Sequence, residues 1–224
     1  MAHEATPSLA TSEFAQSPEL AFEVTGAAPA QGAVPAIALA LRVQRTAGPP
    51  LRALTLTAQV RIAAPRRPYD DQTRERLYTL FGPVADWGRS LRSLQWTRAT
   101  IAVPGFEDEV TIELELPCSY DVEVAHNGYL DAVRDGVIPL ELLFSGTLFY
   151  AGEDNRLRVA QLSWDHEATY ALPAGMWRAA LDRHLPGARW VRLDADRYDR
   201  LREFRSRGAL PSWDATVDAL LDGD

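Results

Sequence analysis

Alternating apolar and polar residues run through the first two thirds of the chain, and this alternation predicts β-strands. Three early segments show the pattern clearly, at residues 20–25, 37–45 and 51–62. The sequence TAGPP at residues 46–50 separates the second segment from the third and is typical of a turn. Short strands that follow one another with turns between them favour an antiparallel sandwich over β-α-β units.

Five later segments continue the pattern, at residues 97–103, 110–116, 120–125, 139–150 and 157–164. The segment VTIELEL alternates strictly, so one of its faces is expected in a core. The segment PLELLFSGTLFY is apolar on both faces, which indicates a central strand. We therefore predict a mainly β protein with some α structure, built as an antiparallel immunoglobulin-like β-sandwich.

Helical periodicity interrupts the strands near residues 70–95 and returns after residue 173. We predict three regions: a disordered tail at 1–17, a sandwich at 18–172 that carries the helical insertion, and C-terminal helices at 173–224. The C-terminal helices are expected to pack on the sandwich, because that would bury Trp177, Trp190 and Trp213.

Composition excludes several classes of protein. The 224 residues carry a net charge of −8, which argues against a general nucleic-acid binder. All 23 basic residues are Arg, so neither a lysine Schiff base nor a Walker A phosphate loop is possible. The single Cys cannot form an internal disulfide and fits a cytoplasmic location. No apolar run approaches the ~20 residues that span a bilayer, so no membrane span is expected.

Charge is unevenly distributed along the chain. Residues 61–98 hold eight Arg and four acidic residues, whereas residues 105–175 hold three Arg and fourteen acidic residues. Such runs are usually solvated surface, and tryptophans are usually core residues. The alternative is an interface with another protein, since Trp and Arg are enriched in binding hot spots. The candidate partner-binding residues are Arg66, Arg67, Trp87, Arg89, Arg92 and Trp96.

A second candidate site is a ligand pocket or active site that would combine Cys118, Tyr120, Asp121 and His166. A nucleophilic Cys needs a nearby base and a lowered pKa, and no nucleophile motif surrounds Cys118. A small buried core residue is the usual alternative for a free Cys. No spacing of His, Cys, Asp and Glu indicates a metal site, so no metal and no cofactor are expected.

Several segments resemble an uncharacterised actinobacterial family of unknown function. They are Pro68-Tyr69, Leu80-Phe81-Gly82 with Trp87, residues 117–121 (PCSYD), 136–150 (GVIPLELLFSGTLFY), 163–165 (SWD), Pro186-Gly187 and 212–214 (SWD). The likeness extends over nearly the whole chain after the tail. It implies a genetic setting beside nickel–iron hydrogenase and maturation genes, and it implies no catalytic residues.

Three functional hypotheses follow. The first is a non-catalytic accessory protein that binds another protein, such as a hydrogenase subunit or maturation factor, as the resemblance implies. The second is an enzyme or small-ligand-binding protein with a pocket near Cys118 and His166. The third is a self-assembling or holdase-like β protein, which exposed apolar edge strands would favour.

Overall fold

The computed structural model describes residues 17–223, so the expected tail at 1–17 lies outside the described residues except for Ser17. The chain divides into two compact units at Ala188. We call the part up to Ala188 the sandwich unit and the part from Arg189 the C-terminal unit. The sandwich unit runs past the expected boundary at residue 172, because it includes one of the C-terminal helices.

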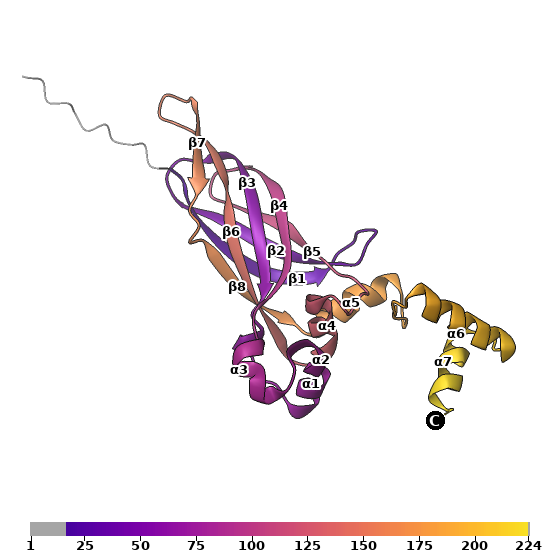
Figure 1. The fold of residues 1–224 in the computed structure, drawn as a ribbon. Helices are drawn as coiled ribbons and strands as arrows, with labels where there is room; N and C mark the ends of the chain where they lie inside the picture. Colours follow the sequence, from indigo (N-terminus) through magenta and orange to yellow (C-terminus); the bar gives the residue numbers. More distant parts are fainter. Residues whose placement is uncertain (1–16, 224) are drawn as a thin grey trace, which may run out of the picture. The chain divides into compact units, whose positions relative to one another are not determined.

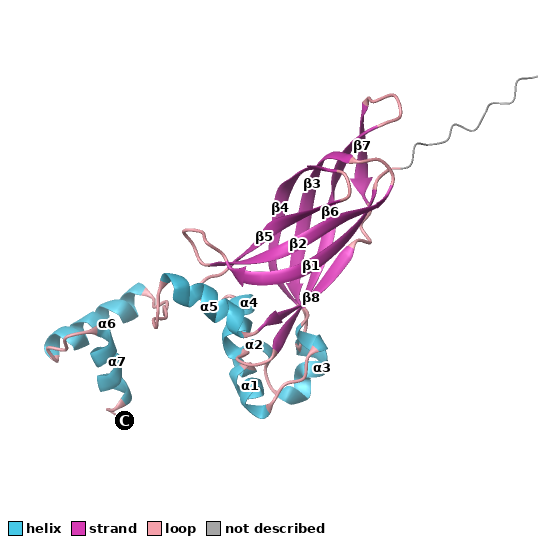
Figure 2. Cartoon of the chain, turned by 180° about the vertical axis from the view of Figure 1, so that it is seen from behind, coloured by secondary structure: helices cyan, strands magenta, loops and turns pink. Residues whose placement is uncertain are grey.

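Two antiparallel sheets form the sandwich unit, and the fold class predicted from the sequence is confirmed. Figure 1 shows the larger sheet in front and Figure 2 shows the smaller one from behind. The smaller sheet has the order β1-β2-β5, with β1 (Glu19–Pro29), β2 (Ala36–Ala47) and β5 (Glu109–Pro117). The larger sheet has the order β4-β3-β6-β7, and β8 also pairs with β6. The strands of the larger sheet are β3 (Leu51–Ile62), β4 (Leu94–Phe106), β6 (Val137–Ala151), β7 (Leu157–Leu162) and β8 (Glu167–Pro173).

The core lies where the inner faces of the two sheets meet. In β2 every second residue from Ile37 to Val43 is completely buried, and in β5 the same holds for Leu114 and Leu116. This is the alternation read from the sequence, with one side of each strand turned inward. β6 is central, as predicted, because it pairs with β3 on one side and with β7 and β8 on the other.

One strand assignment from the sequence is wrong, and one strand was not predicted. Residues 120–125 form a loop that leads into helix α4 (Ala125–Ala132), because local side chains satisfy its backbone. The Asp121 carboxylate accepts a hydrogen bond from the Glu123 amide, and the Asn127 amide group donates to the Asp121 carbonyl. The eighth strand is instead β8, which follows Asp165 and ends at Pro173.

The helical insertion lies at one end of the sandwich, beside α4 (Figure 1). It contains α1 (Asp71–Arg76), α2 (Tyr78–Phe81) and α3 (Trp87–Ser90), with short 3-10 helices at Ala64–Arg66 and Val84–Asp86. Asp70 caps α1 by accepting from the Thr73 amide at 2.7 Å. Gly82 ends α2 with a φ of 72°, a conformation that favours glycine. The insertion is thus a series of short turns rather than one long helix.

The C-terminal helices belong to different units. Helix α5 (Gly175–His184) packs against β1 and β2, and its Trp177 and Leu181 are completely buried. Helices α6 (Ala195–Arg207) and α7 (Trp213–Leu221) lie in the C-terminal unit. Trp190 is 65% exposed in the C-terminal unit, and its burial against the sandwich stays a prediction.

Replacing Gly146 with Ala should destabilise the central strand. A Cβ atom there would lie 2.2 Å from the carbonyl oxygen of Thr55 in the neighbouring strand β3, so the backbone must shift. We expect the free energy of unfolding to fall by about 2–3 kcal/mol, the usual range for overpacking a core. Gly26→Ala is the matched control, because a Cβ at Gly26 would have nothing within 4 Å. Urea unfolding followed by Trp fluorescence measures both, and equal stability of the two variants would contradict the prediction.

Candidate protein-binding surfaces

An aromatic cluster anchors the insertion to the sandwich unit. The Tyr69 hydroxyl donates to the Ala64 carbonyl at 2.6 Å and accepts from the Tyr129 hydroxyl at 2.8 Å. The ring of Trp87 meets Tyr69 edge-on, with centroids 5.3 Å apart, and its Nε1 donates to the Gly82 carbonyl. Burial raises the pKa of both tyrosines, so the pair stays protonated and neutral.

Trp87 and Trp96 are core residues, and their predicted role in partner binding is wrong. Trp87 is 9% exposed within the aromatic cluster, and Trp96 is 5% exposed. The Trp96 Nε1 donates to the Pro117 carbonyl at 3.0 Å, and its ring stacks on His126. Both indole N–H groups therefore have hydrogen-bond partners inside this chain, and both rings are buried away from a partner protein.

The arginines predicted to bind a partner divide into two pairs. Arg66 forms an ion pair with Glu141 at 2.9 Å, and Arg67 donates to the carbonyls of Val137 and Asp135. These two arginines hold the insertion to β6 and the turn before it. Arg89 and Arg92 are exposed, and only Arg89 has a described partner, in an exposed pair with Asp86.

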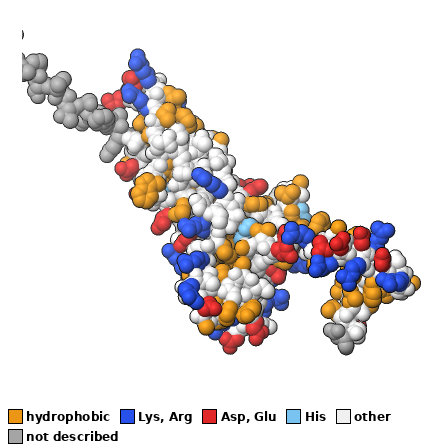
Figure 3. Space-filling model, in the orientation of Figure 1, with side chains coloured by type: hydrophobic (Ala, Val, Ile, Leu, Met, Phe, Trp, Pro, Cys, Tyr) orange, Lys and Arg blue, Asp and Glu red, His pale blue; other side chains and the backbone are white. Residues whose placement is uncertain are grey.

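Two exposed apolar side chains lie in the same insertion as the exposed arginines. Tyr78 projects from α2 and Val84 from the 3-10 helix before α3, and each is about half exposed. The Ser90 hydroxyl donates to the Phe81 carbonyl at 2.6 Å, which fixes α3 against α2. We call Tyr78, Val84, Arg89 and Arg92 the insertion surface. Basic side chains are visible where the insertion joins the sandwich in Figure 3.

The structure does not bring the four residues of the predicted ligand pocket together. Cys118 lies at one end of the smaller sheet, where its amide donates to the Pro35 carbonyl. His166 contacts Phe22, which pairs with Val43 in β2. Pro35 and Val43 are eight residues apart, which in an extended chain is about 26 Å.

Cys118 is a buried core residue that is not activated as a nucleophile. It is 8% exposed, and burial raises the pKa of its thiol to about 12. The nearby Tyr120 hydroxyl donates to the Leu181 carbonyl of α5 at 3.4 Å, and Asp121 stabilises its own loop. In residues 17–223 no three His, Cys, Asp or Glu side chains are grouped so that they could hold a metal ion. No helix among these residues is long and apolar enough to cross a membrane.

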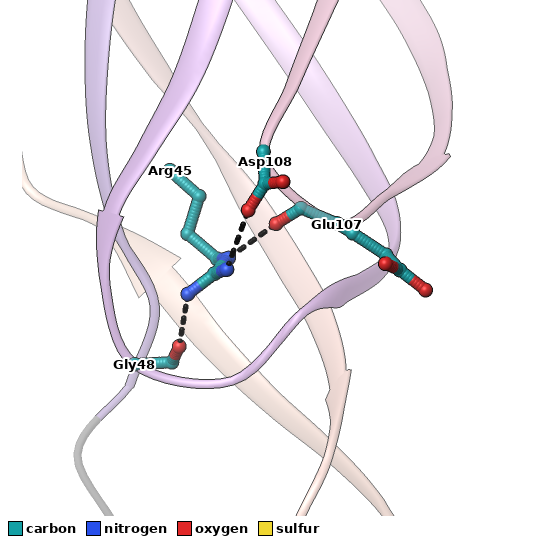
Figure 4. A network of polar contacts seen from close by, with 4 residues as sticks. All are labelled: Arg45, Gly48, Glu107 and Asp108. Atoms are coloured by element: carbon teal, nitrogen blue, oxygen red, sulfur yellow. Dashed lines mark hydrogen bonds and ion pairs between the residues drawn. The ribbon is translucent and has the colours of Figure 1, made fainter.

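An open cavity of about 520 Å³ lies at the end of the sandwich where the β2–β3 and β4–β5 turns meet, and Arg52, Phe106 and Glu107 are among its lining residues. Next to it, Arg45 donates to the carbonyls of Gly48 and Glu107 and pairs with Asp108 (Figure 4). The guanidinium group thus ties the two turns together. Because its donors are already used inside the chain, Arg45 is a bracing residue rather than a ligand-binding charge.

The C-terminal unit is a pair of capped helices that a few specific contacts hold together. Asp194 caps α6 and Ser212 caps α7 through backbone amides at 2.8 and 3.0 Å. The Tyr198 and Trp213 rings have centroids 5.8 Å apart, and the Arg205 guanidinium lies over Trp213. Arg205 also donates to two carbonyls of the connecting turn, so the angle between the helices is fixed by specific contacts.

The helical pair contains an open cleft of about 510 Å³. Leu201, Phe204 and Leu220 form its apolar part, and the charged residues around them are Arg197, Arg200, Glu203 and Arg207. Helix α6 is densely charged, with five Arg and three acidic residues among thirteen. The packing of α6 and α7 on the sandwich stays a prediction.

The described fold and surfaces define a β-sandwich protein with a helical insertion and a separate helical pair. The chain belongs to the family DUF6084, a family of unknown function, whose match covers residues 17–224. The resemblance to a family of unknown function is thereby confirmed. The chain has no match among curated proteins.

The solved structures that match this chain are distant from it. The CARDB domain of the PF1109 protein from Pyrococcus furiosus, solved with di-metal ions, is 10% identical over 70% of this chain and 87% of that one, with a TM-score of 0.28. β-Glucosidase 3B from Thermotoga neapolitana is 13% identical, and a β-glucosidase from Kluyveromyces marxianus is 14% identical. Both matches cover 69% of this chain, span 17% and 15% of those chains, and have TM-scores of 0.24 and 0.23. No function is transferred from these similarities.

The Cys118 thiol should resist alkylation while the protein is folded. With a pKa of about 12, roughly one thiol in ten thousand is ionised at pH 8, and only the thiolate reacts. Because the pKa is raised, reactivity should increase only as the pH approaches 12. Iodoacetamide labelling followed by mass spectrometry should show modification in urea and almost none in buffer. Rapid labelling of the folded protein at pH 8 would contradict this assignment.

Proposed function

We propose that this protein is a non-catalytic accessory protein that binds another protein through the insertion surface. The observation that carries the proposal is that one insertion combines a buried aromatic attachment with exposed arginines and exposed apolar side chains. Trp87, Tyr69 and Tyr129 hold the insertion in place by buried contacts. Tyr78, Val84, Arg89 and Arg92 remain exposed on its outside.

Such a surface has the features of a small binding interface. Aromatic residues and arginine are enriched where proteins bind one another, and a pre-organised surface loses little conformational entropy on binding. The basic charge of the surface favours an acidic partner, because complementary charges accelerate encounter and suppress wrong partners. Arg89 is 86% exposed, so a partner can displace its weak pair with Asp86.

The partner we propose is a subunit of a nickel–iron hydrogenase or one of its maturation factors. This part of the proposal rests on the family resemblance described above and on its implied genetic setting. In this role the protein would hold or guide a partner during assembly and would perform no chemistry itself. The proposed pocket near Cys118 and His166 is not carried forward, because the structure separates those residues.

The double substitution Arg89→Glu with Arg92→Glu should weaken partner binding and leave the fold intact. It reverses two exposed charges. The free energy of unfolding should therefore change as little as it usually does for substitutions on the surface. Affinity purification of the tagged protein from its native cells at low salt, followed by mass spectrometry, measures recovery of the partner. We expect recovery to fall by about tenfold, since about 1.4 kcal/mol of lost binding free energy has that effect.

The matched control is Arg98→Glu with Arg156→Glu, which reverses two exposed charges on β4 and the β6–β7 turn, outside the insertion. This variant should recover the partner like the unchanged protein. If both double variants recover it equally well, the insertion surface is not the binding site. If the unchanged protein recovers no hydrogenase subunit or maturation factor, the proposed partner is wrong.

A further inference from the structure

Exposed apolar side chains are concentrated in the C-terminal unit. Nine large hydrophobic residues are exposed there, namely Trp190, Val191, Leu193, Tyr198, Phe204, Trp213, Val217, Leu220 and Leu221. This is half of the eighteen found among the described residues, in a unit of 36 residues. Exposed apolar side chains that are concentrated in one small unit point to a contact site.

The charges of this unit divide between its two helices. Among the arginines that line the cleft, Arg197 pairs with Asp194 and Arg207 pairs with Glu203, so Arg200 is the lining arginine without a described ion pair. Helix α7 and the residue after it carry three acids, Asp214, Asp218 and Asp222, and no basic residue. The unit therefore presents a basic apolar cleft and an acidic apolar helix at the same time.

The apolar and acidic residues of α7 form neighbouring stripes. Trp213, Val217 and Leu221 recur every four residues, so they lie along one side of the helix. Asp214 and Asp218 each follow one of these residues directly and lie on the adjacent side. Leu221 is 73% exposed, so an apolar side chain and neighbouring carboxylates are both available to enter a basic cleft.

We propose that the α6–α7 cleft binds α7 of a second copy of this chain, and that a twofold-symmetric dimer results. A twofold interface requires one surface to complement itself, and a unit with both a basic cleft and an acidic helix meets that requirement. The exposed apolar residues of α7 fill the cleft of the partner copy, and Asp218 faces Arg200. The same contact is repeated with the two copies exchanged.

The apolar surface is large enough for such a dimer. Aromatic side chains carry roughly 150–250 Å² each, so the four partly exposed aromatic residues of the unit offer about 400 Å². The five exposed aliphatic residues add to this area. A stable dimer buries about 600–800 Å² per copy, which the unit can supply without help from the sandwich.

Sedimentation velocity of the full chain over a range of concentrations tests the proposal. The unchanged protein should sediment as a dimer, and Leu221→Asp should shift it to a monomer. Arg200→Asp and Asp218→Arg should each raise the dimer Kd by about tenfold or more, because each places like charges at both symmetric contacts. The double variant with both substitutions should recover the dimer, since the exchanged charges again attract.

Arg202→Asp is the matched control, because Arg202 is an exposed arginine of the same helix that does not line the cleft. It should leave the dimer unchanged, and circular dichroism should show equal helix content in all variants. A chain that stays monomeric at every concentration would overturn the proposal, whether α6 and α7 pack on their own sandwich or remain exposed. A dimer that survives Leu221→Asp and both charge reversals would overturn it equally, because the interface would lie elsewhere.

Discussion

The burial of one face of each sheet against the other is the constraint on which the rest of the structure depends. Every second side chain from Ile37 to Val43 in β2 is removed from water because the larger sheet covers it, as are Leu114 and Leu116 in β5. The driving force is the removal of apolar surface from water, and it sets the register of every strand, since a shift by one residue would turn the apolar side chains outward. In β6 the close approach of Gly146 to the backbone of β3 adds a second restriction, because a Cβ atom would not fit there.

The insertion takes its position from that core. Its aromatic residues belong to the same apolar cluster as the strands, and the hydroxyl pair of Tyr69 and Tyr129 joins it to α4. The chain between β3 and β4 can therefore be built from short turns and still present a defined surface. Arg66 and Arg67 bind the insertion to β6 and the turn before it. Arg89 and Arg92 are exposed to solvent.

The strands were predictable because a period of two is a strong local signal. The alternation in VTIELEL at residues 110–116 predicts a strand with one buried face. β5 is that strand, and its buried residues lie on the predicted face. Residues 120–125 have a similar apolar content, but Asp121 and Asn127 offer the backbone closer partners than a neighbouring strand does. Whether the backbone bonds to local side chains or to a neighbouring strand depends on side-chain geometry, which the periodicity of the sequence does not predict.

The candidate sites were less predictable because they depend on contacts between distant segments. Trp87 and Trp96 stand near arginines in the sequence, but their burial is decided by Tyr69, Tyr129 and Pro117. Cys118 and His166 were grouped by their chemistry alone, and the strands that carry their neighbours place them at different levels of the sandwich.

The most direct test of the account is hydrogen–deuterium exchange of the protein with and without the partner that it recovers from its native cells. The account predicts that binding slows exchange in residues 78–92, which carry the insertion surface, while β2 and β6 keep the slow exchange of a core. Unchanged exchange in residues 78–92, together with new protection elsewhere in the chain, would contradict the central claim that the insertion binds the partner.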